Sequence, residues 1–244
     1  MAPLSVSHFI RITQNVECET CVFDVADGTI SGNFTVRRQL VLKTKSGAID
    51  ANITMISNAT RVYPGPIVDI TTSTGPVNLD FTLVAVDGPE AKVDVPFAGL
   101  YEITTRSRHA PVRLEVVDAP VNSTLVLSSK NTMGPLEIYL HPTYQGTFGS
   151  EALIGGTPIG IRGYTTDPSG EGRKRNVVWN SQSIPPGVHN VLSGEVWWGD
   201  RPEPPCSDGP YIPTFGSVRT KSVIGNPLIL LHLSDPNTTS ILTN

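Results

Sequence analysis

The chain has 244 residues, of which 39% are hydrophobic and only 16% charged, and it contains 22 glycines and 21 prolines. This composition is typical of short strands joined by tight turns, because glycine permits positive φ and proline fixes φ at turns. The net charge of −4 argues against a nucleic-acid partner, which needs clustered Lys and Arg, and no apolar stretch approaches the roughly 20 residues of a membrane span.

The N-terminal residues 1–11 lack the basic start and apolar core that mark a secretory signal. We therefore expect a cytoplasmic location, with unconventional secretion or a fragment of a longer chain as alternatives. The Asn-x-Ser/Thr sequons point the other way, because glycosylation requires export, although they arise easily by chance in a Thr-rich β protein. They lie at Asn33, Asn52, Asn58, Asn122 and Asn237.

Three cysteines are too few for a disulfide framework. Cys18 and Cys21 have the spacing of half a zinc site, but no second such pair exists elsewhere in the chain. A redox pair would open a helix after a strand, whereas residues 15–25 read as β structure. The sequence predicts ordinary thiols here, with no metal and no cofactor.

The strongest signal is an internal repeat. Each copy is an alternating apolar strand ending in Ser or Thr, a polar turn closed by Gly or Ala, then usually Pro and a second alternating strand. The clear copies are residues 40–53, 67–81, 100–116, 125–140 and 217–231, and a weaker copy spans 23–36. Alternation buries one face of each strand and exposes the other.

The repeats predict a single all-β domain over 1–244, with an irregular insertion at 141–215 and no helix. Two architectures remain open. In a β-solenoid-like stack, neighbouring repeats cover one another's apolar faces. In a two-sheet β-sandwich, each repeat is a hairpin. The likeness of the copies in sequence, and not only in period, favours the stack.

The Ser-x-Gly-Pro turns before alternating strands, together with residues 140–148 (LHPTYQGTF), resemble the adhesin-like β-solenoid family known from bacteria. They are more closely similar to uncharacterised basidiomycete fungal proteins with the same repeat. The resemblance covers residues 20–235. It implies a right-handed solenoid-like fold, no catalytic activity and no cofactor.

Motifs for catalysis are missing from the sequence. It contains no Gly-x-Ser-x-Gly elbow, no phosphate-binding loop and no His-Glu-x-x-His. Asp80 and Glu115 occupy polar strand positions and would line up on one outer face of a regular stack. The alternative interpretation is a cation or sugar site there, and the preferred one is a solvated face with Lys and Arg neighbours.

Trp197, Trp198 and Tyr211 are the candidate ligand-binding residues, because indole rings stack on sugars and on partner proteins. Adjacent strand residues face opposite ways, so one of the two tryptophans is expected in the core. The basic run Arg173-Lys174-Arg175 lies in a Gly/Ser-rich stretch and is interpreted as a solvated loop.

These observations predict a non-enzymatic, adhesion-like structural protein that self-associates or binds another protein. The alternative is a carbohydrate-binding, lectin-like module. A polysaccharide-cleaving enzyme would need two carboxylates and a basic residue converging in a deep groove.

Overall fold

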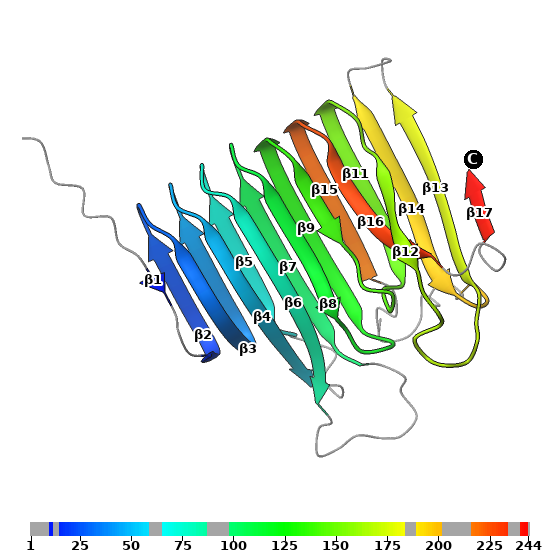
Figure 1. The fold of residues 1–244 in the computed structure, drawn as a ribbon, viewed down its shortest axis with the longest axis horizontal. Coiled ribbons are helices and arrows are strands. Elements are labelled where there is room, and N and C mark those ends of the chain that lie inside the picture. Colours follow the sequence, from blue (N-terminus) through cyan, green and yellow to red (C-terminus); the bar gives the residue numbers. More distant parts are fainter. Residues whose placement is uncertain are drawn as a thin grey trace, which may run out of the picture.

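A computed structural model describes residues 10–11, 15–58, 65–86, 98–183, 189–201, 216–233 and 240–243. In these residues the protein is all β without a helix, as predicted from the sequence, and so holds no helix able to cross a membrane. The strands form a mixed, mostly parallel sheet that is not closed. Figure 1 shows them side by side along the molecule, from β2 at one end to β13 and β17 at the other.

The strands follow the alternating segments of the sequence. They are β1 (Ile10–Arg11), β2 (Val16–Val25), β3 (Ile30–Thr44), β4 (Ile49–Asn58), β5 (Ile67–Thr72), β6 (Val77–Val86), β7 (Leu100–Ser107), β8 (Val112–Asp118), β9 (Thr124–Met133), β10 (Leu136–Tyr139), β11 (Gly146–Ile154), β12 (Ile159–Tyr164), β13 (Arg175–Ser183), β14 (Asn190–Trp198), β15 (Gly216–Ile224), β16 (Pro227–Leu233) and β17 (Ser240–Thr243).

Each strand of a repeat pairs in parallel, and in register, with the equivalent strand of a neighbouring repeat. In the first strands the aligned residues are Leu40, Val68, Ile103, Leu127 and Val218. In the second strands they are Ile49, Val77, Val112, Leu136 and Pro227. All five predicted copies therefore share one register.

This pairing produces two sets of strands. We call the first layer the set β5, β7, β9, β15, β11, β14 and β13, together with the C-terminal halves of β2 and β3. The second layer is β4, β6, β8, β10, β16 and β12, together with the N-terminal parts of β2 and β3. Alternate side chains of both layers are buried in one core, which the aligned residues above exemplify. Both layers therefore contribute to one continuous hydrophobic core.

The turns between the layers are held by the last residue of the first strand. In the copy at 67–81 the Thr72 hydroxyl accepts a hydrogen bond from the Gly75 amide at 3.1 Å. The same bond joins Thr44 to Gly47 at 3.0 Å. Gly75 packs so closely on the preceding turn that a Cβ there would lie 1.6 Å from the carbonyl oxygen of Gly47. This close approach is what requires glycine at the turn.

The order of the repeats in space differs from their order in the chain. β15 lies between β9 and β11, and β16 lies between β10 and β12, with parallel pairing on both sides of each strand. The C-terminal repeat, β15 and β16, is therefore inserted between the β9–β10 repeat and the β11–β12 pair that follows it in sequence. Figure 1 shows it as the orange strands between the green ones.

The stretch 141–215, expected as an irregular insertion, supplies β11, β12, β13 and β14 to the same sheet. β14 pairs antiparallel with both β11 and β13, and β17 adds to β13 in parallel. This hairpin makes the sheet mixed and extends the first layer past the last repeat.

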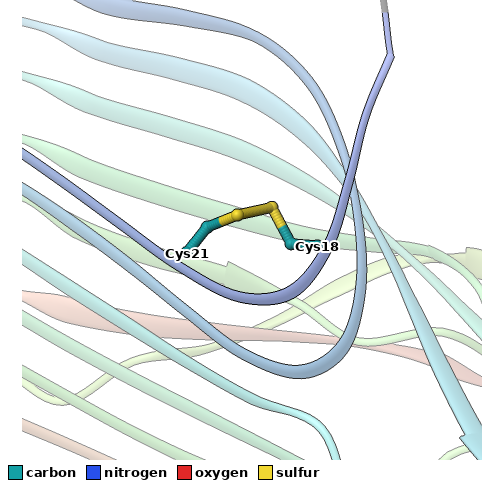
Figure 2. Close-up of a disulfide and its surroundings, with 2 residues drawn as sticks. All are labelled: Cys18 and Cys21. Carbon is teal, nitrogen blue, oxygen red and sulfur yellow. A yellow bond between two sulfur atoms is a disulfide. The ribbon is translucent and has the colours of Figure 1, made fainter.

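The prediction of free thiols was wrong for two of the three cysteines, because Cys18 and Cys21 form a disulfide. In a straight strand their Cα atoms would lie about 10 Å apart. β2 instead bends at a register shift between Cys18 and Thr20, which brings the two Cα atoms to 5.7 Å, within the range a disulfide can bridge. Figure 2 shows the bridge spanning the bend.

Candidate functional site

An open groove of about 850 Å³ lies on the first layer, where β9, β15, β11, β14 and β13 run side by side. Its volume falls in the range of ordinary ligand sites. The groove forms because small residues occupy the middle of the outer face, where Gly149 of β11 is paired with Ser193 of β14. A Cβ on Gly149 would meet only the Leu192 carbonyl, at 3.5 Å.

Charged and polar side chains border the groove. They include Lys130, Arg219, Lys221, Glu151, Glu195 and Asn180. Lys221 donates to Glu151 at 2.8 Å, and the His189 ring nitrogen lies 3.1 Å from the same carboxylate oxygen. Hydrogen bonding from Lys221 holds the pKa of the Glu151 carboxyl below its usual range, against a smaller opposing effect of burial. Glu151 is therefore ionised near neutral pH and acts as a hydrogen-bond acceptor.

Trp197 lines the groove but is largely covered, with 8% of its surface exposed. The Arg201 guanidinium lies 5.7 Å from the centroid of the indole ring and pairs with Glu195 at 2.6 Å. The groove therefore offers a ligand charged and hydrogen-bonding groups beside apolar surface, but Trp197 is no open aromatic platform.

Trp198 is buried and serves the fold. Its indole N–H donates to the Pro142 carbonyl at 2.9 Å, and its backbone N–H donates to the Gln145 side chain at 3.0 Å. Arg175, fully buried, stacks on the ring at 4.9 Å and donates to the Tyr144 carbonyl at 3.1 Å. Together these contacts fix the β13–β14 hairpin to the connection between β10 and β11.

The prediction that residues 173–175 form a solvated basic loop was wrong for Arg175. Burial lowers the pKa of this guanidinium to about 9, so it keeps its charge at neutral pH. Carbonyl oxygens and the indole ring stabilise the cation in place of a carboxylate. Arg173 is also anchored, because Asp167 accepts from its Nε at 2.9 Å. Charge count alone does not reveal such anchors.

The predicted binding residues are only partly brought together. Trp197 and Trp198 are adjacent on β14. We expected one of the two in the core, whereas both are buried. Tyr211 lies outside the described residues.

Asp80 and Glu115 do line up, as the repeat predicted, because they are paired in register on β6 and β8. Arg113 lies between them, 3.2 Å from Asp80 and also paired with Glu115, which Arg162 contacts as well. These cations neutralise the carboxylates, so this face matches the preferred interpretation of a salt-bridged surface. No group of three or more metal-ligating side chains occurs among the described residues.

The residues that sequence reasoning missed are those bordering the groove, above all Lys130, Arg219 and Lys221. Lys130 and Lys221 occupy the same position in two copies of the repeat, one residue before the Asn or Ser that precedes the turn. Aligning the copies by position would have shown this recurrence of positive charge.

Comparison with known proteins returns no match, whether with family models, with curated proteins or with solved structures. Function must therefore be inferred from the geometry of this chain.

Proposed function

We propose that this protein is a non-enzymatic, adhesion-like β-solenoid whose N-terminal end associates with a second copy or with another protein. The observation that carries the proposal is the open edge of β2. Residues 20–25 pair with β3 on one side, and no described strand pairs on the other. An unpaired strand exposes a row of backbone donors and acceptors that favours pairing with another chain.

The side chains of this edge support the same proposal. Cys21 and Phe23 point toward the core in register with Leu40 and Leu42, yet both are only half-buried. Val22, on the outer side, has 61% of its surface exposed. The end of the core is thus incompletely covered by the described residues, and added chain would bury more apolar surface.

Size-exclusion chromatography with light scattering over a range of protein concentrations tests the proposal. We expect a concentration-dependent dimer or larger species for the parent protein. Val22→Lys places a charge on this exposed edge position and should shift the species toward monomer, whereas Val22→Ala should not. A parent that stays monomeric at every concentration, and that captures no protein partner, would contradict self-association and protein binding together.

A non-enzymatic role fits the ionisable groups of the described residues. Several groups with shifted pKa values are held by structural partners. The carboxyl of Asp167, for example, has a depressed pKa because Arg173 and backbone amides donate hydrogen bonds to it. Tyr101 and Tyr144 have raised pKa values because they are buried. Glu151, which does line the groove, has a depressed pKa because Lys221 donates to it.

The groove favours a second candidate function, the binding of a carbohydrate. Its open lining, which combines polar and apolar side chains, suits a sugar with hydroxyl groups and apolar ring faces, and Gly149 gives a direct way to test it. Gly149→Leu would fill the hollow without entering the core, and should abolish hits on a glycan array. Gly163→Leu is the matched control, because a Cβ there meets no atom within 4 Å.

The disulfide bears on the location of the protein. Disulfides persist mainly in oxidising compartments and are rare in the cytosol. Cys18–Cys21 therefore favours export over the cytoplasmic location that we expected from the N-terminal residues.

A further inference from the structure

We propose that the groove and the strands beside it bind an acidic polysaccharide, one whose sugars carry carboxylate or sulfate groups. This inference rests on the proposed carbohydrate-binding function and specifies its ligand class. The binding element is a ladder of cations on three consecutive strands of the first layer: Arg106 on β7, Lys130 on β9 and Lys221 on β15, with Arg219 beside Lys221. We call these four residues the basic ladder.

The register of the sheet sets the geometry of the basic ladder. Arg106 is paired with Lys130, and Lys130 with Lys221, so their side chains leave the same face of adjacent strands. Adjacent strands are about 4.8 Å apart. Arg219 precedes Lys221 by two residues on β15 and points the same way. All four side chains are exposed, and the row leads directly into the groove.

Like charges directly opposite one another in a sheet are destabilising. Among the described residues, Arg106, Lys130 and Arg219 have no carboxylate within ion-pair distance, and only Lys221 is paired, with Glu151. The nearest acidic positions of β5 and β7 are Asp69 and Glu102, which are offset along the strands from the Arg106–Lys130 row.

The second layer shows that this protein can pair its surface charges. There Arg113 of β8 pairs with Asp80 on the neighbouring β6 and with Glu115 on its own strand, and Arg162 of β12 also pairs with Glu115. Unmatched cations on the first layer are therefore a feature of that face and not of the sheet as a whole. A bound polyanion would supply the missing negative charge.

The surroundings favour a polysaccharide over a nucleic acid. The row of Arg219 continues across the groove as Gly149, Ser193 and Asn180, which offers space and hydrogen-bonding groups rather than further cations. Nucleic-acid binding depends on neutralising many phosphates, whereas this chain has a net charge of −4. A chain of sugars with spaced charges and many hydroxyl groups matches both parts of the surface.

Isothermal titration with three hexasaccharides tests the inference: hexagalacturonate, a heparin-derived hexasaccharide and neutral cellohexaose. We expect one or both acidic ligands to bind, with the preferred one identifying carboxylate or sulfate, and the affinity to fall as salt is raised. The double variant Lys130→Gln/Arg219→Gln should weaken binding about tenfold, as expected for the loss of two charged contacts. Neither side chain forms an ion pair with a described residue, so the fold should be unchanged.

Arg38→Gln/Lys174→Gln is the matched control, because it makes the same change in net charge at two exposed sites away from the ladder. It should leave the affinity unaltered. Equal loss in both variants, no loss in the ladder variant, or tighter binding of a single-stranded oligonucleotide would overturn the inference. If only cellohexaose binds, the inference of an acidic ligand is wrong but the proposed carbohydrate-binding function stands. If no glycan binds, both the inference and the carbohydrate-binding function are wrong.

Discussion

Single residues in this protein are constrained mainly by the repeat above or below them. The turn glycines show this, since the space for a Cβ at Gly75 is taken by the backbone of Gly47, and the space at Gly47 by the carbonyl of Gly28. A substitution at one turn glycine therefore also affects the turn of the neighbouring repeat. The same stacking aligns charges, which creates the basic ladder.

Gly75→Ala should destabilise the protein by about 3 kcal/mol or more, because a methyl group in a close-packed site forces the backbone to move. Thermal or urea unfolding measures the change. Gly163→Ala provides the comparison, since the added Cβ contacts nothing there and should alter stability little. Similar losses for the two variants would show that close approach is not the reason for glycine at 75.

Two histidines make stability depend on pH. Burial lowers the pKa of His141 and of His232 below the usual 6.5, with further lowering by nearby Arg175 and opposing effects of Asp118 and Glu115. His141 Nδ1 also accepts from the Thr143 amide at 3.3 Å, which suits the neutral ring. The stability contributed by the neutral rings is fully present above pH 6.5 and is lost as the pH falls through the folded-state pKa values.

We therefore expect the free energy of unfolding to decrease between pH 7 and pH 5. In this window Glu151 and Asp167, whose carboxyl pKa values are depressed, stay ionised in the folded protein. The variant His141→Gln/His232→Gln should flatten the dependence. An equally steep dependence in the variant would assign the effect to other groups.

At the scale of elements, β2 and β3 each pass from one layer to the other within a single strand. β3 does so at residues 37–38, and β2 follows the same path beside it, with Cys18 opposite Val36 and Thr20 opposite Gln39. Among the described strands, residues 20–25 of β2 have a neighbour on one side only, so the bend has less support there. The disulfide supplies that support.

Cys18→Ser/Cys21→Ser should lower stability by about 2 kcal/mol, the chain-entropy estimate for so short a loop. The loss should be local: hydrogen exchange should speed up in β2 and leave β6 and β8 protected. Arg37→Gln, which removes the exposed ion pair with Glu17 at the same corner, should cost less than 1 kcal/mol. Uniform loss of protection would contradict the view that the disulfide acts on the terminal strand alone.

At the scale of the whole molecule, much of the fold could be predicted and its spatial order could not. Alternation in segments such as residues 77–81 identifies the strands, and recurrence identifies the shared register. The apolar pattern around Val218 is compatible with two positions for β15, either beside Leu127 of β9 or at the end of the row of repeats. The sequence therefore does not predict that β15 separates β9 from β11. For the site, Trp197 lies in the groove, but hollows made by a small residue such as Gly149 leave no signature in one sequence.

The inserted repeat should determine the stability of everything beyond it. Val218→Ala, at a fully buried position of β15, should cost about 2 kcal/mol and accelerate hydrogen exchange in β11 to β14 as well as in β15 and β16. Val68→Ala in β5 is the matched control, because β5 lies among repeats whose order in space is the same as their order in the chain. Effects of Val218→Ala confined to β15 and β16 would show that the β11–β14 region is stable without them.

The position of β15 and β16 has a consequence for synthesis of the protein. Residues 146–201 leave the ribosome before residues 216–233 exist, so translation cannot deliver the strands in the order in which they pair. Until the C-terminal segment arrives, β9, β10, β11 and β12 each lack a neighbour that they have in the finished fold. Polypeptides that stop short of residue 216 would carry those open edges permanently and should be prone to aggregate.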